Sequence, residues 1–409
     1  MQGILLILTL FVTLTSVGLT VLNLKQLSKP LPQLPSLLAA VIEPETWRRA
    51  IDYARDRARL GLVSLLVVRA VTVLCLFGGV VAAYDAWVTT HVSTFVASGV
   101  VFALGLAAAA FVVSLPFSLY LHFVVEARYG FNRMSFGLWC KDHVKGALIS
   151  GVLLSGVVAL GLSLVSWFPS YYWLFAWALL AALSVLMSIA WPHVIEPLFF
   201  KVVPLRDPEL EPRIRELAER ARVQVSRVFQ VDASKRSNHS NAYFSGLGPE
   251  KRVVLFDTLL ARMNANEILG VLAHELGHYR KHHVLQRFVA GEILSLAAFY
   301  AGSQLLARTN VATWVGASDG SFAFRALVVG YAFSLLSFAA TPLFSYWSRK
   351  HEREADAFAS ELTRDPTALA SGLAKLSRDN LSNLNPHPIY SAFYASHPPA
   401  RERIAALSQ

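Results

Sequence analysis

The sequence has little cysteine and little charge. Its two cysteines, Cys75 and Cys140, lie in an apolar stretch and in a polar loop, which excludes a disulfide framework and a cysteine-based metal site. Only 16% of the residues are charged, whereas 55% are hydrophobic, and the mean hydropathy is +0.46. A soluble domain cannot bury that much apolar surface, so the composition predicts a membrane protein.

The net charge of +10 could suggest a nucleic-acid partner, but the basic residues do not gather in one soluble segment. They lie mostly between apolar stretches, and membrane topology explains this pattern better than a polyanion does. We therefore expect a lipid bilayer as a partner and no nucleic acid. We also expect the chain to be monomeric.

Seven apolar stretches reach the length of about 20 residues that crosses a bilayer. The first lacks the basic start and the small-residue cleavage site of a signal peptide, so we expect it to remain as a helix. The predicted fold class is mainly α, a polytopic membrane protein with seven transmembrane helices. The stretches cover residues 3–22, 62–84, 97–124, 146–168, 172–194, 285–307 and 323–347.

The loops predict the orientation of these helices. Seven Lys and Arg residues lie between the first two stretches, and residues 128–145 are basic again, whereas residues 85–94 carry none. Because Lys and Arg favour the cytoplasmic side, we expect the N-terminus outside and the C-terminus inside. The predicted organisation is a membrane region (1–194), a cytoplasmic segment (195–283), two further membrane helices (284–347) and a C-terminal cytoplasmic segment (348–409).

The first cytoplasmic segment has the pattern of a small β-sheet followed by a helix. Residues 225–232 and 251–260 suit strands, and residues 241–245 suit a short strand at a sheet edge. Asn264 and Glu267 have the spacing of a capping box, which predicts a helix beginning at Ala265. Apart from Gly270 and Gly277, no glycine or proline interrupts this helix, so the pattern allows it to continue into the sixth apolar stretch.

The sequence VLAHELGHYRKHH, residues 271–283, carries the clearest chemical pattern. On a helix, residues four apart share a face, so His274 and His278 can reach one metal ion, and Glu275 can accept a proton from metal-bound water. The alternative is a solvated helix face that happens to carry histidines. A third ligand distinguishes the two interpretations.

The third ligand is expected from the second cytoplasmic segment. A metzincin site would need Gly at position 281 and His at position 284, where the chain has Lys281 and Val284, so that type is excluded. The stretch SRKHEREADAFA, residues 348–359, offers Glu352, Glu354 and Asp356. Glu352 and Asp356 are also four apart, so one can bind the metal while the other supports a ligand from behind.

Five motifs together resemble the Ste24-type CAAX prenyl proteases of peptidase family M48. They are ARYGFNRMSFGLWCKD, HSNAYFSG, HELGH, SRKHEREADAFA and SHPPARERI, in this order from about residue 120 to the C-terminus. The resemblance implies one Zn²⁺ per chain, held by His274, His278 and Glu352, with Glu275 as general base. It implies a ring of seven helices around a water-filled chamber, closed by a cytoplasmic zinc domain.

The resemblance also implies roles for residues around the metal. Asp356 holds the metal-binding side chains in place and Arg403 organises the nearby carboxylates, while His397 steadies the oxyanion. The edge strand binds the substrate backbone as an added strand, which assigns substrate contacts to Asn241, Ala242 and Tyr243.

Five further polar residues are open to more than one interpretation. Arg69 and Glu292 lie at membrane depth and either line a chamber or form a buried structural pair. His282 and His283 follow the metal motif, and a structural role is expected for His283 rather than metal binding. His239 precedes the edge strand and either contacts substrate or makes a loop hydrogen bond.

The implied reaction removes the C-terminal aaX tripeptide from prenylated CAAX proteins. Alternatives are a quality-control protease of the same family with non-prenylated substrates, and a transporter or channel with a regulatory metal. A site-2-type intramembrane protease is excluded because the only Asp-Gly pair, Asp319-Gly320, lies in an outside loop. The expected location is a bacterial inner membrane, or the endoplasmic reticulum membrane in a eukaryote.

Overall fold

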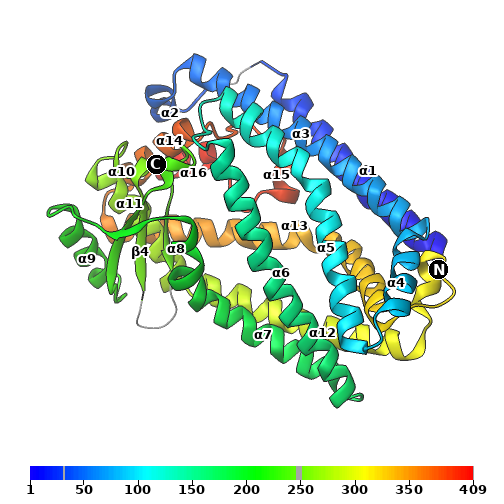
Figure 1. Cartoon of the computed structure of the whole chain (residues 1–409). Helices are drawn as coiled ribbons and strands as arrows, with labels where there is room; N and C mark the ends of the chain where they lie inside the picture. The colour runs from blue at the N-terminus through cyan, green and yellow to red at the C-terminus, as the bar shows by residue number, and fades with distance from the viewer. Residues whose placement is uncertain (31–32, 246–250, 409) are drawn as a thin grey trace.

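The computed structural model describes residues 1–30, 33–245 and 251–408. Figure 1 shows long helices that run between two ends of an elongated molecule. One end holds the N-terminus and the short helix α4 (Val80–His91), and the other holds a small sheet and several shorter helices. The seven long helices are α1 (Gln2–Leu27), α3 (Pro44–Phe77), α5 (Phe95–Tyr120), α6 (Phe136–Trp167), α7 (Tyr172–Ala190), α12 (His283–Arg308) and α13 (Phe322–Thr363).

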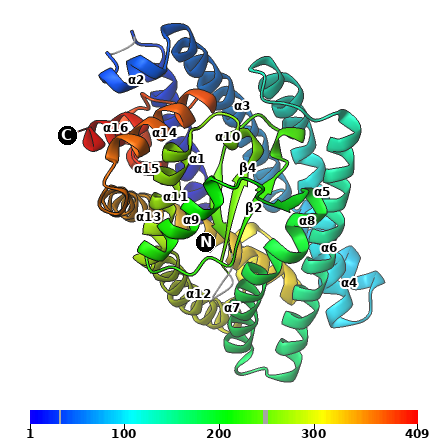
Figure 2. The same ribbon diagram turned by 90° about the vertical axis from the view of Figure 1, so that its left-hand side faces the viewer.

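The long helices form a closed ring. Along the ring α1 contacts α3, α3 contacts α5, and the contacts continue through α6, α7, α12 and α13, which returns to α1. Figure 2 shows this arrangement from the sheet end. Within the described residues, seven helical segments are long and apolar enough to cross a membrane, and each contains one helix of the ring. The predicted ring of seven membrane helices is therefore confirmed.

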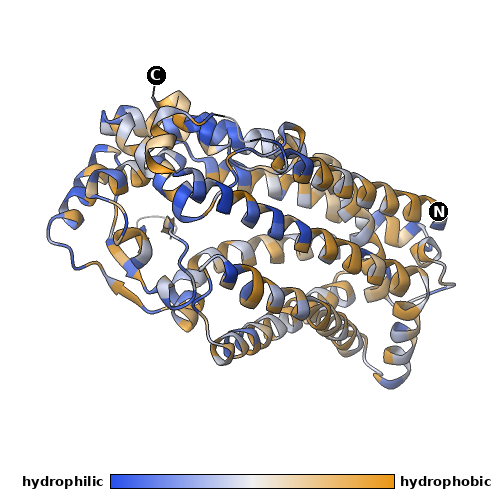
Figure 3. Cartoon of the chain, turned by 90° about the horizontal axis from the view of Figure 1, so that it is seen from above, coloured by the Kyte–Doolittle hydropathy of each residue, from blue (hydrophilic) through white to orange (hydrophobic). Residues whose placement is uncertain are grey.

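The surface of the ring suits a lipid environment. Leu148 and Val152 on α6 and Leu343 on α13 are exposed large apolar side chains of the kind that soluble proteins bury. Figure 3 shows apolar colouring along the long helices and more hydrophilic colouring toward the sheet end. The second predicted stretch, 62–84, was wrong at its end, because α3 stops at Phe77 and Gly79 has a φ of +82° before α4 begins.

A four-stranded sheet lies at the end opposite the N-terminus (Figure 1). Its strands, in the spatial order β1-β2-β4-β3, are β1 (Val202–Pro204), β2 (Arg227–Val231), β4 (Arg252–Phe256) and β3 (Ala242–Ser245). Three of them confirm the predicted strands, and β3 lies at the sheet edge as expected. Strand β1 was not predicted, because three residues ending in Pro204 show no alternating pattern.

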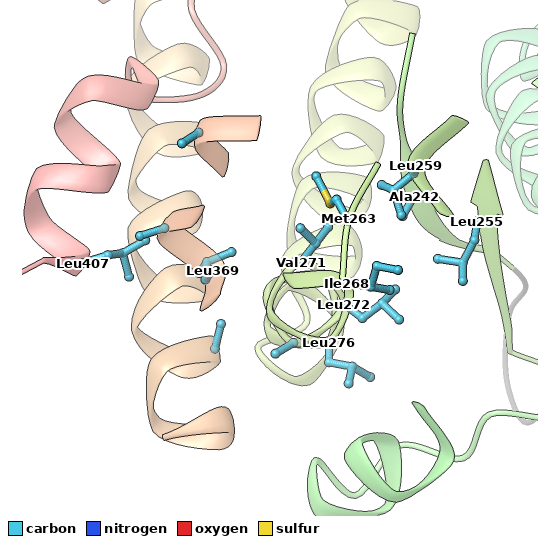
Figure 4. Packing of buried hydrophobic residues seen from close by; sticks show 14 of the residues in the cluster. Ala242, Leu255, Leu259, Met263, Ile268, Val271, Leu272, Leu276, Leu369 and Leu407 are labelled. Carbon is cyan, nitrogen blue, oxygen red and sulfur yellow. The ribbon is translucent and has the colours of Figure 1, made fainter. Parts of the chain in front are cut away.

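The helix with the HELGH motif, α11 (Ala265–Arg280), begins at the predicted capping box. Asn264 Oδ1 accepts from the Glu267 N–H at 3.0 Å, and Glu267 Oε2 accepts from the Asn264 N–H at 2.9 Å. The helix buries Ile268, Leu272 and Leu276 in a core shared with β3, β4 and α14 (Pro366–Asp379), as Figure 4 shows. This core fixes the face of α11 that remains for the histidines.

Two glycines allow α11 to pack closely against its neighbours. A Cβ at Gly277 would lie 2.9 Å from the Ala355 Cα of α13, and a Cβ at Gly270 would lie 2.8 Å from the Leu369 N of α14. Both distances are too short for a real contact, so glycine is required at each position. The Gly277 contact sets the distance between the two helices that carry the candidate metal-binding residues.

The expected continuation of α11 into the next membrane helix was wrong. Helix α11 ends at Arg280, and α12 starts at His283 after His282 adopts a left-handed conformation with a φ of +56°. This turn needs neither Gly nor Pro, and the sequence therefore gives no sign of it. It brings His283 back toward α11.

The remaining elements connect and cover the sheet end. Helices α14 and α15 each start at a proline, Pro366 and Pro388. The other short elements are α2 (Ser36–Val41), α8 (Glu196–Phe199), α9 (Leu210–Arg220), α10 (Asp257–Leu260), α15 (Pro388–Tyr394), α16 (Ala400–Leu407), the π-helices Leu121–Glu126 and Trp191–Ile195, and the 3₁₀ turns Ala233–Lys235 and Val311–Val315.

Candidate metal centre

Two helices bring the predicted metal-binding residues together. His274 and His278 lie on α11 and Glu352 lies on α13, and one ligand atom from each falls within 4.8 Å of the other two. The Glu352 carboxylate lies 3.4 Å from His274 Nε2 and 3.1 Å from His278 Nε2. His274 and Glu352 are buried and His278 is half-buried. The structure thus brings Glu352 to the predicted histidine pair, and the three side chains form one cluster.

The polar contacts of the cluster bring two imidazole nitrogens and one carboxylate to the same point. His274 Nδ1 lies 2.8 Å from an Asp356 oxygen, which places its proton on Nδ1 and a lone pair on Nε2. His278 Nε2 faces that atom at 3.2 Å. Glu352 Oε2 is buried and has no hydrogen-bond partner in the described part of the chain. Two imidazole nitrogens and a carboxylate converging in this way fit a divalent cation such as zinc.

Asp356 and Arg403 support the cluster from behind. Arg403, on α16, donates from Nε to Asp356 at 2.8 Å and from a terminal nitrogen to its other oxygen at 2.6 Å. Another Arg403 nitrogen lies 3.4 Å from Glu352 Oε2. Burial disfavours the charge on Arg403, but the hydrogen bond and charge of Asp356 raise its pKa above the ordinary value. These contacts orient His274 and neutralise the excess of carboxylates.

His278 is supported from behind by His283, the residue for which the sequence predicts a structural role. His283 Nδ1 lies 3.1 Å from His278 Nδ1, and its Nε2 lies 3.0 Å from Glu354. The His283 ring is fully buried and stacks on His351, with centroids 3.9 Å apart and planes 5° apart. Glu354 was one of three carboxylates considered for the metal, and the structure places it behind His283 instead.

Glu275 and His397 lie at the same site. Burial raises the pKa of the Glu275 carboxyl above its ordinary value, and the positive charges of His274 and His278 oppose this shift. A raised pKa suits a group that must take up a proton and release it. His397 precedes α16, and its Nε2 lies 3.3 Å from Glu352 Oε1 while 60% of its side chain is exposed. It is therefore open to a ligand from solvent.

Strand β3 is the last strand of the sheet, and within the described residues no other strand pairs with its outer edge. The Asn241 carbonyl accepts from the Phe256 N–H of β4 at 3.1 Å. Because hydrogen-bonded pairs alternate along an antiparallel ladder, the main-chain groups of Ala242 and Phe244 point to the open edge. Asn241 is exposed. The Tyr243 hydroxyl donates to Glu196, so this side chain is already bound within the protein.

Other candidates lie away from the cluster. His239 makes the loop hydrogen bonds that were one of its two expected roles, to Asn380 and Glu126 at 3.2 Å each. Glu292 and Arg69 are both half-buried in their membrane helices, and the Glu292 carbonyl accepts from Trp177 at 3.2 Å. None of these side chains joins the group of three.

Comparisons with known proteins cover the whole chain. Residues 23–201 match the family model described as CAAX prenyl protease N-terminal, five membrane helices, and residues 204–409 match that of peptidase family M48. A CAAX prenyl protease 1 homolog of Arabidopsis thaliana is 33% identical and aligns over 95% of this chain and 93% of its own length. CAAX prenyl protease 1 of Saccharomyces cerevisiae is 31% identical, over 92% and 88%.

A solved structure shows the same fold. The crystal structure of S. mikatae Ste24p has a TM-score of 0.93 to this chain at 29% identity and covers 100% of this chain and 99% of its own. The likeness extends over the helix ring and the sheet together. The chain therefore belongs to peptidase family M48 and is a membrane zinc metalloprotease.

Proposed function

We propose that this protein is an integral-membrane zinc endopeptidase that removes the C-terminal aaX tripeptide after a prenylated cysteine. The observation that carries the proposal is the convergence of His274, His278 and Glu352 beside Glu275. The helix α11, which carries both histidines, also packs against the edge strand β3. The names of the Arabidopsis and yeast relatives support the substrate class. One Zn²⁺ per chain follows from the single group of three ligands found in the described residues.

The chain's own residues divide the chemistry between them. Zinc bound at the cluster supplies a Lewis acid and lowers the pKa of a bound water to about 7. Glu275 accepts the proton of the attacking water and passes it to the leaving amine. Exposed His397 donates to the oxygen of the scissile carbonyl as negative charge develops there. Asp356 and Arg403 keep His274 in the tautomer that leaves Nε2 free.

The edge strand holds the substrate in register. The Ala242 carbonyl and the main-chain groups of Phe244 face the open edge and can pair with an extended peptide. The Ala242 N–H donates to Asn241 Oδ1 at 2.9 Å, and the exposed Asn241 side chain contacts the peptide backbone through its amide group. Main-chain pairing does not depend on sequence, which suits a substrate whose two aliphatic positions vary. Tyr243 contributes its main chain to the sheet, while its hydroxyl binds Glu196.

The basic loops support an orientation with the N-terminus outside and the sheet end in the cytoplasm. Prenylated proteins are made in the cytoplasm, and the proposed orientation gives them access to the metal cluster. We place the protein in a bacterial inner membrane, or in the endoplasmic reticulum membrane of a eukaryotic source, as a monomer. Protease accessibility of the two termini in sealed vesicles tests the orientation.

The function is tested with purified protein in detergent and two matched peptides. One peptide ends in a farnesylated CAAX sequence and the other has the same sequence without the lipid. We expect release of the tripeptide from the farnesylated peptide, and a loss of about 100-fold to 10,000-fold in kcat for Glu275→Gln with zinc retained. Glu361→Gln, an exposed glutamate on α13, is the matched control and should keep full activity.

Each outcome assigns a different function. Equal cleavage of both peptides, still lost in Glu275→Gln, contradicts the prenylated substrate and supports a quality-control protease. No cleavage of either peptide by the zinc-bound protein contradicts the protease function and favours a transporter or channel with a regulatory metal. Near-full activity of Glu275→Gln contradicts the proposed general base.

A further inference from the structure

A polar cavity lies beside the start of the edge strand. It has a volume of about 470 Å³ and is lined by residues of α3, the π-helix after α5, the loop that leads to α6, and the loop before β3. Its lining includes Arg57, Glu126, Asp142, Arg236 and His239. Two sequence motifs, ARYGFNRMSFGLWCKD and HSNAYFSG, meet here, and the metal chemistry uses neither the first motif nor this cavity.

The carboxylates of the cavity already have partners. Glu126 accepts from the Tyr53 hydroxyl at 2.6 Å, and its other oxygen lies 3.2 Å from His239 Nε2. Asp142 accepts from Arg236 Nε at 2.9 Å. Both acids are shielded from solvent, with side-chain exposures of 12% each. The negative charges of the cavity are therefore committed to groups of the protein.

Arg57 is the exception among the charged groups of this cavity. Its guanidinium donates to the Tyr53 hydroxyl at 3.2 Å, and no carboxylate in the described part of the chain lies within 4.0 Å of it. The residue is exposed, whereas Arg236 is paired with Asp142. An arginine at the rim of a cavity, with donors to spare, suits the capture of a carboxylate from outside the chain.

The position of the cavity relative to β3 indicates which carboxylate it takes. A peptide that adds antiparallel to β3 runs with its C-terminus toward Asn241 and then toward His239. Asn241 and His239 are two residues apart, about 7 Å in an extended chain, and the three residues of an aaX tail span roughly 10 Å. A tail that leaves the strand edge at Asn241 is therefore long enough to reach the cavity that His239 lines.

We infer that this cavity binds the C-terminal carboxylate of the substrate, with Arg57 as the main donor. The inference rests on the proposed function and deepens it, because it names the feature that selects a free C-terminus. A fixed anchor for the carboxylate, combined with a fixed register on β3, sets the distance from the chain end to the cut.

The test compares two farnesylated peptides that differ only at the C-terminus, one ending in a free carboxylate and one in a carboxamide. Wild-type protein should cleave the acid with a kcat/KM about tenfold to a hundredfold higher, the value of a charge-assisted hydrogen bond. In Arg57→Gln this preference should fall close to one, through a rise in KM for the acid. Arg59→Gln, an exposed arginine on the same helix outside the cavity lining, should keep the wild-type preference.

The ratio of the two peptides is measured on one protein sample, so partial misfolding of a variant does not change it. Arg57→Lys should recover part of the preference, because it restores the charge without the planar fork. Equal cleavage of acid and amide by wild type, or an unchanged preference in Arg57→Gln, overturns this inference alone. Failure to cleave either peptide overturns the proposed function and this inference with it.

Discussion

His283 should control metal affinity although it does not face the metal position. Its Nδ1 lies 3.1 Å from His278 Nδ1, and its Nε2 lies 3.0 Å from Glu354. If His278 binds zinc through Nε2, its proton must lie on Nδ1 and needs an acceptor. His283 provides that acceptor when its own proton lies on Nε2, where Glu354 accepts it. One proton arrangement therefore satisfies all three side chains.

The expected loss follows from the burial of this chain of hydrogen bonds. Replacing a hydrogen-bond partner behind a metal-binding histidine costs 10-fold to 100-fold in metal affinity, or about 1.4 to 2.7 kcal/mol. His283 has 0% exposure, so water has no direct access to replace the lost acceptor. We expect His283→Phe to lie in the upper half of that range. Phenylalanine keeps the stacking on His351 and removes both nitrogens.

The assay is competition for zinc between the purified protein and a chelator of known affinity. His283→Asn, whose side chain retains a hydrogen-bond acceptor, should lose less affinity than His283→Phe. The control is His282→Asn, because His282 is exposed and asparagine tolerates its positive φ. Zinc binding by His283→Phe within twofold of wild type would refute the proposed support of His278, provided that the variant unfolds at the wild-type temperature.

Three further outcomes follow from the packing and the caps. Gly277→Ala should destabilise the protein by about 1 to 3 kcal/mol and weaken zinc binding, because the new Cβ separates α11 from α13. Gly270→Ala should cost similar stability against α14 with little effect on zinc affinity, and equal effects of the two on zinc would contradict the proposed spacing role of Gly277. Asn264→Ala should lower the free energy of unfolding by about 1 kcal/mol through loss of the capping box. Denaturation of the variant and of the wild-type protein in the same detergent measures this difference.

The local features of this fold could be read from the sequence. Long apolar runs predict the membrane helices, and the capping box at Asn264 and the HELGH spacing predict α11 and its metal-binding face. These signals act over a few residues, so each is visible in a single chain. The choice of Glu352 over Glu354 for the metal came from the family resemblance, and the structure explains it by placing Glu354 behind His283.

Other features depend on contacts between distant segments. The order of helices around the ring, and the short strand ending at Pro204, exist only through their partners. The turn at His282 uses a positive φ at a residue other than glycine, which no local signal announces. Arg57 is one of seven basic residues between the first two apolar stretches, and only the fold distinguishes it from the others by placing it at a cavity.

The most direct test of the metal centre is removal and return of the metal. The protein is stripped with a chelator, and zinc is added back in known amounts while tripeptide release from the farnesylated peptide is followed. We expect no activity without metal and a linear recovery that stops at one zinc per chain. Glu352→Gln should need more zinc, and Glu275→Gln should bind the same zinc and stay inactive. Full activity of the stripped wild-type protein would contradict the account.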